Sequence, residues 1–234
     1  MIDEPRYAIY YTPPAEHPLT RAAARWLGRS AFRRATSFDD EVAEDAWSVT
    51  TEPRRYGFHA TLKAPFRLAA GRQVSELEQA LSSFVAARRP CVLGPLQLDL
   101  IGSFFALVPR KMSPTVLAFA SSIVEAFDGF RAAPTEAELR RRLSSRLNDI
   151  EREYVARWGY PYVFDRYQFH MTLTEKLSPE AQSKVRERLE ELLGALAMDD
   201  YTIDALTLFE QKRPGADFHV RSRFKFMTED VTSD

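Results

Sequence analysis

Two of the four histidines in this chain stand in the same short motif. A phenylalanine precedes both His59 and His170. A threonine stands two positions after each histidine and a leucine three positions after it, so both segments read Phe-His-x-Thr-Leu, where x is any residue. Imidazole titrates near neutral pH, so one ring can accept a proton while the other, protonated, donates one. Thr61 and Thr172 each add a hydroxyl that donates a hydrogen bond without adding charge. The pair of motifs predicts one site for in-line displacement at a phosphate that the hydroxyls hold between the two histidines.

Each motif lies in a segment that is typical of a β-strand. Residues 55–62 and 166–173 are rich in aromatic and β-branched residues, and apolar residues alternate with polar ones. Side chains of a strand point to alternate faces, so each histidine shares a face with the threonine two positions later. By the same alternation Lys63, Arg55 and Gln168 fall on the site faces, and we expect them to bind the rest of the substrate.

Each of these residues also has a structural interpretation. A lone histidine is more often structural than catalytic, and threonine is a common strand residue, but the matched spacing of the two motifs favours a site. The Lys63 ammonium either steadies phosphate charge or pairs with a carboxylate elsewhere. No carboxylate or cysteine follows either histidine at the spacing of metal ligands, so we expect no metal and no other cofactor. We expect His17 to precede a helix and His219 to lie outside the site.

The order of expected elements repeats along the chain, which indicates two similar halves. Strand, helix, spacer, motif strand, helix and strand occur once in each half. We therefore expect an α+β fold of one domain, residues 1–234, in which two β-sheets face each other across a central groove and helices lie outside. Lobe 1, about residues 1–101, carries His59, and lobe 2, about residues 102–234, carries His170. The expected strands are 6–12, 55–62, 92–101, 103–108, 166–173, 201–209 and 218–226, and the expected helices are 18–28, 74–88 and two that begin at Ser113 and Ser178.

A helical insertion at about residues 134–160 carries many arginines. The sequence Thr135-x-x-Glu138 is a capping box that predicts the start of one long helix, and Gly159 predicts its end. Apolar residues at spacings of three and four run along it. The arginines belong either to a solvated outer face or to a flank that attracts anions beside the groove.

Composition excludes several classes of protein. The chain has 234 residues, a hydrophobic content of 45% and a formal net charge of −1, so no global charge favours nucleic acid or an anionic membrane. The one cysteine, Cys91, cannot form an internal disulfide, and we expect it to be buried in a protein of the reducing cytoplasm. The first residues lack the basic and apolar regions of a signal peptide, and no stretch is long and apolar enough to span a bilayer. We expect neither a membrane nor an obligate protein partner.

The duplicated motif resembles that of the 2H phosphoesterase superfamily. There the motif is histidine, any residue, threonine or serine, and an apolar residue, once in each half of the chain. The superfamily contains RNA 2′,3′-cyclic phosphodiesterases and 2′-5′ RNA ligase-like proteins. The resemblance implies a bilobal 2H-like fold and metal-independent catalysis by His59, Thr61, His170 and Thr172. The strings at residues 56–66 and 6–14 resemble a narrower branch that is associated with phosphonate-utilisation gene clusters.

Three functions remain open at this point. The first is a hydrolase that opens a cyclic phosphodiester of a small sugar phosphate or nucleotide, as the branch resemblance suggests for phosphonate breakdown. The second is an RNA-end enzyme acting on 2′,3′-cyclic or 2′-5′ linkages, which would need a basic groove with stacking aromatics. The third is a non-catalytic module that binds a nucleotide or phosphate. Two proton-transfer groups favour the hydrolase, since a binder has no need of them.

Overall fold

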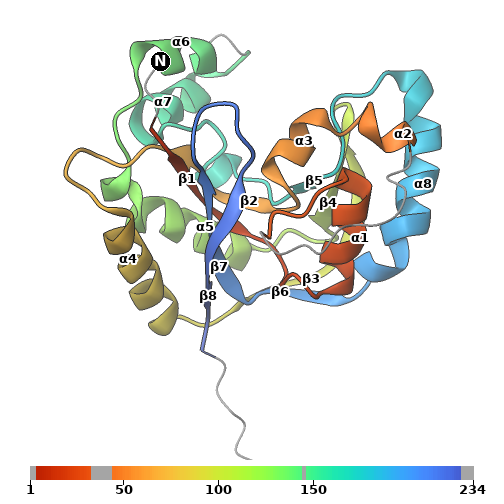
Figure 1. Cartoon of the computed structure of the whole chain (residues 1–234), viewed down its shortest axis with the longest axis horizontal. Helices are drawn as coiled ribbons and strands as arrows, with labels where there is room; N and C mark the ends of the chain where they lie inside the picture. Colours follow the sequence, from red (N-terminus) through yellow and green to blue (C-terminus); the bar gives the residue numbers. More distant parts are fainter. Residues whose placement is uncertain (1–3, 33–43, 144–145, 228–234) are drawn as a thin grey trace, which may run out of the picture.

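The protein has an α+β fold built on one antiparallel sheet (Figure 1). The computed structural model describes residues 4–32, 44–143 and 146–227. Within these residues, eight strands lie in the order β6-β3-β4-β5-β2-β1-β7-β8. The strands are β1 Arg6–Tyr11, β2 Ala60–Phe66, β3 Cys91–Ile101, β4 Phe104–Pro109, β5 Met171–Thr172, β6 Asp200–Ile203, β7 Ala205–Gln211 and β8 His219–Lys225.

Helices cover one face of this sheet and form the main core with it. Buried residues from the helices, among them Leu19, Leu77, Ile123 and Leu189, pack in one cluster with strand residues such as Ile9. Burial of such side chains is the main stabilising term of the fold. The helices are α1 Pro18–Leu27, α2 Glu44–Trp47, α3 Thr51–Tyr56, α4 Val74–Ala86, α5 Pro114–Ala126, α6 Glu136–Leu143, α7 Asp149–Trp158 and α8 Pro179–Ala197, with two short 3₁₀ turns, η1 Asp128–Phe130 and η2 Phe164–Arg166.

The opposite face of the sheet carries only a small apolar cluster, of Ala8, Tyr10, Ala31, Phe209 and Phe218. Alternation along β1 explains the division, because Tyr7, Ile9 and Tyr11 belong to the main core while Ala8 and Tyr10 point the other way. The main cavity described below lies on this second face.

The α+β fold predicted from the repeat is confirmed, with one feature that the sequence did not indicate. The two four-stranded halves of the sheet are joined where β2 meets β5, through the pair Ala60 and Met171. Strands from the two sequence halves interleave, since β3 pairs with β4 and β6, while β7 pairs with β1. The lobe boundaries at residues 1–101 and 102–234 stay a prediction.

Several expected elements are confirmed with their caps. Helix α1 ends at Gly28, which has a φ of 68°, and the Ser113 hydroxyl accepts a hydrogen bond from the Val116 amide at 3.2 Å at the start of α5. His17 is the N-cap of α1, where its Nδ1 accepts from the Leu19 amide. Cys91 is buried in β3.

The two motif strands are shorter than predicted. Residues 51–56 form α3, so Arg55 and Tyr56 are helical, and β2 begins only at Ala60. The second strand consists of Met171 and Thr172: Met171 pairs with both β2 and β4, whereas Thr172 pairs with β4. Helix α3 is capped by Gly57, and the residues between it and Ala60 pair with no strand. In this segment the tertiary context overrides the local preference for a strand.

Two other elements are divided where one was predicted. The arginine-rich insertion is two helices, α6 and α7, and Asn148 begins the second with a capping box to Glu151, both bonds being 2.9 Å. Residues 144–145 of the expected helix lie outside the described residues. The strand expected at 201–209 is β6 and β7, separated at Asp204, whose carboxylate binds Arg223 at 2.7 Å.

Candidate active site

The pairing of the two motif strands brings both histidines and both threonines to one face of the sheet. Ala60 lies opposite Met171 in the antiparallel β2–β5 pair. Continuing this register by one residue in each direction sets Thr61 across from His170 and His59 across from Thr172. Because directly opposite residues share a face, the histidine of each motif meets the threonine of the other.

The two imidazoles are held in the same way. Nδ1 of His59 lies 2.8 Å from the carbonyl oxygen of Gly57, and Nδ1 of His170 lies 2.8 Å from that of Gln168, so each ring bonds to the residue two positions before it. A carbonyl accepts only, so Nδ1 carries the hydrogen in both rings and Nε2 of the neutral ring is the bare acceptor. The Thr61 hydroxyl lies 3.4 Å from Nε2 of His59. Both histidines are therefore oriented to exchange a proton through Nε2.

Tyr10 supports the first histidine from the floor of the site. Its ring stacks on the His59 imidazole, with centroids 3.8 Å apart and planes 23° from parallel. Tyr10 lies opposite Thr61 in the β1–β2 ladder and is buried. The stack fixes the plane of the imidazole and excludes water from one of its faces.

A cavity of about 590 Å³ opens over this group of residues. Its lining includes His59, Thr61 and Thr172. A smaller adjoining cavity, of about 40 Å³, is lined by Thr61, Gln168 and His170. Thr61 borders both, so each of the four residues predicted from the motifs lines one of two neighbouring cavities, and the larger one has room for a small phosphorylated molecule.

Burial lowers the pKa of both histidines. The pKa of His59 falls from 6.5 to about 4, mainly through desolvation; the Gly57 carbonyl opposes this shift and the charge of His170 adds to it. Desolvation likewise lowers the pKa of His170, against the hydrogen bond to Gln168. Both pKa values therefore lie below that of a free imidazole, and both rings are neutral at pH 7.

We expect a bell-shaped dependence of kcat/KM on pH with its maximum on the acid side of neutrality. The active form carries one proton on the pair, and it is populated between about 4, the pKa of His59, and the pKa of His170, which lies below 6.5. Above that range no acid remains, and below it no base remains. The two apparent pKa values belong to the coupled pair. A profile with one ionisation, or with its maximum at alkaline pH, would contradict this assignment.

Gly57 sets the carbonyl that holds His59. Its φ of 77° and ψ of 176° lie in a region that is essentially restricted to glycine. A Cβ at this position would also lie 2.7 Å from the Cβ of Ala31. The sharp turn at the end of α3 therefore needs glycine both for its backbone angles and for its close approach to the segment after α1.

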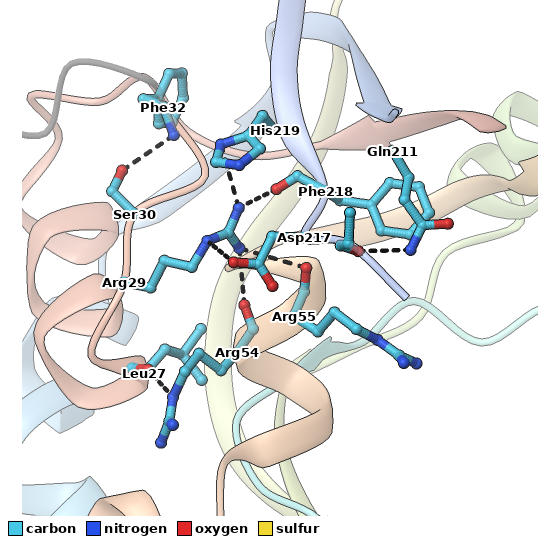
Figure 2. A network of polar contacts seen from close by, with 11 residues as sticks. Leu27, Arg29, Ser30, Phe32, Arg54, Arg55, Gln211, Asp217, Phe218 and His219 are labelled. Atoms are coloured by element: carbon cyan, nitrogen blue, oxygen red, sulfur yellow. Dashed lines mark hydrogen bonds and ion pairs between the residues drawn. The ribbon is translucent and has the colours of Figure 1, made fainter. Parts of the chain in front are cut away.

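The helix that precedes Gly57 is anchored by the buried guanidinium of Arg29 (Figure 2). It donates hydrogen bonds to the carbonyl oxygens of Arg54, at 2.8 Å, and of Phe218, and it pairs with Asp217 at 3.3 Å. This network ties the end of α3 to the start of β8 and so positions the Gly57 turn. His219 belongs to the same network, since its Nδ1 lies 3.4 Å from Arg29, and it does not line the cavity of the motifs.

We expect Gly57→Ala to lower both stability and turnover. The strained backbone costs about 1–3 kcal/mol, and the displaced carbonyl no longer fixes His59 Nδ1, so kcat falls even in the folded fraction. Urea unfolding and kcat are the measurements. Gly71→Ala is the matched control, because Gly71 has a φ of 80° but no atom within 4 Å of a new Cβ, so it loses stability through strain alone. A Gly57→Ala protein with the kcat of the control would contradict the role of this carbonyl.

The prediction that Lys63 binds substrate is corrected by the structure. Its ammonium is buried and donates to the carbonyl oxygen of Val124 at 3.0 Å and to Asp128 at 3.1 Å. The cause is a β-bulge, because Thr61 pairs with Tyr10 whereas Lys63 pairs with Ile9. The extra residue turns Lys63 to the core face, opposite to the face of Thr61.

Arg55 and Gln168 are also placed differently from the prediction. Arg55 lies on α3, pairs with Glu52 at 2.7 Å and borders a separate cavity. Gln168 lies in the segment before β5 and lines the small cavity beside His170, but its observed role is that of its carbonyl oxygen, which positions the imidazole. Neither residue lies on a motif strand.

Sequence reasoning missed several residues that line the main cavity. Tyr56 comes from α3, Tyr160 follows α7, and Phe104 begins β4, with its ring centroid 6.1 Å from that of His170. Lys176 also lines this cavity. The only local signal for them is their aromatic or basic character, because each comes from a segment remote from at least one motif.

Among the described residues, no group of three or more His, Cys, Asp or Glu side chains is placed to hold a metal ion. In the same part of the chain, no helix is both long and apolar enough to cross a membrane. The expectation that no metal or cofactor is needed stays a prediction.

Residues 61–219 match the family described as "Protein of unknown function (DUF1045)". The chain belongs to this family. The match includes Thr61, His170 and Thr172 and begins two residues after His59.

Two curated relatives match over most of this chain. Both are named "Ribose 1,5-bisphosphate phosphokinase PhnN". The protein of Janthinobacterium sp. (strain Marseille) is 36% identical over 229 residues, which cover 94% of this chain and 51% of the relative. That of Laribacter hongkongensis (strain HLHK9) is 35% identical over 223 residues, which cover 92% and 50%. This member of the DUF1045 family spans about half the length of these relatives.

Several solved structures are also similar. One titled as a phosphoesterase is 15% identical, covers 95% of this chain and 99% of its own, and has a TM-score of 0.41. E. coli LigT complexed with 3′-AMP is 13% identical, covers 97% and 99%, and has a TM-score of 0.42.

Proposed function

We propose that this protein is a metal-independent phosphoesterase that opens a cyclic phosphodiester of a small sugar phosphate or nucleotide. The observation that carries the proposal is the Ala60–Met171 pair, whose register, continued by one residue on each strand, sets Thr61 across from His170 and His59 across from Thr172. Both imidazoles bond to the backbone through Nδ1 and keep Nε2 for proton exchange. A phosphate over this group would meet a base, an acid and two neutral hydroxyl donors.

In the proposed reaction His59 acts as the base and His170 as the acid. Burial lowers the pKa of His59 to about 4, and its contact with Gly57 leaves Nε2 without a hydrogen, so Nε2 removes a proton from water as the water oxygen attacks phosphorus. The bond from phosphorus to the leaving ring oxygen breaks on the opposite side, and His170 gives that oxygen its proton. Thr61 and Thr172 donate to the non-bridging oxygens, where charge increases in the transition state. The products are a phosphomonoester and a free hydroxyl.

The names of the curated relatives support a ribose phosphate as the substrate. Those proteins are named for phosphorylating ribose 1,5-bisphosphate, and this chain corresponds to about half of each. Hydrolysis of a cyclic phosphate on C1 and C2 of ribose 5-phosphate yields ribose 1,5-bisphosphate when the bond to O2 breaks. The proposed reaction would thus supply the compound in their name, within phosphonate breakdown.

A second candidate, the RNA-end enzyme, is favoured by the aromatic lining of the cavity. Tyr56, Tyr160 and Phe104 border it, and nucleobases stack on such rings. The net charge of −1 does not favour a long nucleic acid.

The test is a panel of cyclic phosphates followed by phosphorus NMR. It contains a ribose 1,2-cyclic phosphate with a 5-phosphate, 2′,3′-cyclic mononucleotides and an oligonucleotide with a 2′,3′-cyclic end, each with and without prior chelation of metals. We expect conversion of the small cyclic phosphates at a rate that chelation leaves unchanged. A preference for the oligonucleotide that grows with its length would favour the RNA-end enzyme. Binding of cyclic phosphates without turnover of any would favour a non-catalytic module.

A further inference from the structure

A second cavity, of about 280 Å³, is lined by three arginines that the proposed chemistry does not use. Arg6 comes from β1, whereas Arg141 and Arg142 come from α6. Figure 1 shows α6 and α7 beside the N-terminal end of β1. None of the described residues that line this cavity is acidic. Its charge is therefore strongly positive although the whole chain is nearly neutral.

This cavity adjoins the one that contains the motifs. Tyr56 and Tyr160 border both, and so do Ala64 and Pro65 of β2. The two spaces are thus separated by shared side chains and not by an intervening layer of the core. A molecule with its reacting phosphate at His59 would have to pass the two tyrosines to reach the arginines.

Arg142 is the most informative of the three. Its side chain is partly buried, and among the described residues no hydrogen bond or ion pair holds it. The nearby carboxylate of Glu138 is already bound by Arg67, at 3.2 Å, and by the Thr135 amide, at 2.8 Å. Burial lowers the pKa of Arg142; the charge of Glu138 opposes this shift, and the charges of Arg141 and Arg6 add to it. With Arg6 and Arg141 on the same cavity, the partly buried charge of Arg142 favours an anion in this space.

Arg6 lines the same cavity and is held in place by fixed contacts. Its Nε donates to Oε1 of Gln211 at 2.8 Å and its guanidinium lies 5.6 Å from the centre of the Phe218 ring, so the group is held at the start of β1. Guanidinium groups present paired N–H donors that match the oxygens of a phosphate, and several around one cavity suit a dianion better than a carboxylate.

We propose that Arg6, Arg141 and Arg142 form a subsite for a second phosphate, a terminal phosphomonoester of the small substrate whose cyclic phosphate lies at the two motifs. The assignment of the reacting end rests on the proposed function. The subsite explains how a chain with no excess of basic residues selects a small, doubly phosphorylated molecule: two charged ends are each met by local donors.

The test is the ratio of kcat/KM for two substrates that differ by one group, adenosine 2′,3′-cyclic phosphate with and without a 5′-phosphate. In the wild-type protein we expect the 5′-phosphate to raise kcat/KM. In Arg142→Met the ratio should fall roughly 10- to 100-fold, since a hydrogen bond to a charged group contributes about 1.5–3 kcal/mol. Arg142→Lys should retain part of the preference because it keeps the charge.

Arg140→Met is the matched control. Arg140 lies on the same helix, but its side chain is 76% exposed and pairs with Glu136 at 3.5 Å, and it does not line the cavity. The Arg140→Met substitution removes the same charge as Arg142→Met, so a general electrostatic effect would change the ratio of kcat/KM values alike in both variants. Equal ratios in the wild-type, Arg142→Met and Arg140→Met proteins would overturn the subsite and leave the proposed function standing.

A binding measurement separates the subsite from catalysis. The affinity for ribose 5-phosphate is measured by isothermal titration calorimetry, and circular dichroism verifies the fold of each variant. We expect the wild type and the His59→Ala, His170→Ala double variant to bind it, and Arg142→Met to bind it more weakly. This result without turnover of any cyclic phosphate would support the subsite and refute the proposed function. Equal affinity of the wild-type and Arg142→Met proteins would overturn the subsite, whatever the activity.

Discussion

Replacing either His59 or His170 with alanine is expected to lower kcat on a cyclic phosphate by about 10²–10⁴-fold, the usual contribution of one proton-transfer group. His59→Ala removes the ring that lies between Tyr10 and the Thr61 hydroxyl, and His170→Ala removes its counterpart across the β2–β5 pair. Each single variant should also lose one limb of the pH profile, because one of the two titrating groups is gone. Steady-state kinetics across the pH range test both expectations.

The double variant distinguishes a pair from two independent residues. Residues that act as a unit are non-additive, so His59→Ala, His170→Ala together should be little slower than the slower single variant. His17→Asn is the matched control, because it removes an imidazole that caps α1 and replaces it with another good N-cap residue. Near wild-type turnover in both single variants would rule out the acid–base assignment.

Removing either hydroxyl, by Thr61→Val or Thr172→Val, is expected to lower kcat by about 10²–10³-fold, the usual loss for one donor to a developing anionic charge. Valine keeps the shape of the side chain and the strand propensity, so the fold should be retained. Both apparent pKa values should stay close to those of the wild type, since a neutral donor is lost and no titrating group. The effect on kcat should exceed that on KM, because the charge on the non-bridging oxygens grows in the transition state.

Thr207→Val is the control for these substitutions. Thr207 lies opposite Tyr10 in the β1–β7 pair, and its hydroxyl is buried without a hydrogen-bond partner. Valine there removes an unsatisfied polar atom, so stability should be maintained or rise while kcat is unchanged. If Thr61→Val and Thr172→Val behave like this control, the two threonines serve only as strand residues.

Several features of the protein follow from the sequence alone. The matched motifs predicted His59, Thr61, His170 and Thr172 as site residues by their spacing, and the structure places all four along two neighbouring cavities. The helices that begin at Ser113 and Ser178 could be predicted because caps and apolar periodicity act within one or two turns of chain. The α+β class followed from the repeated order of elements.

The tertiary structure decided what depends on pairing between distant segments. Alternation placed Lys63 beside Thr61, but a bulge opposite Ile9 and Tyr10 turned it to the core, where Asp128 binds it. Likewise, the sequence left two interpretations of the arginines in the insertion, a solvated face or a flank that attracts anions. The tertiary structure places Arg142 of α6 and Arg6 of β1 on the same cavity. Local pattern specifies which face a residue prefers when the strand is regular. Register, bulges and the neighbours of a helix are set by burial across the whole sheet, which the sequence does not display locally.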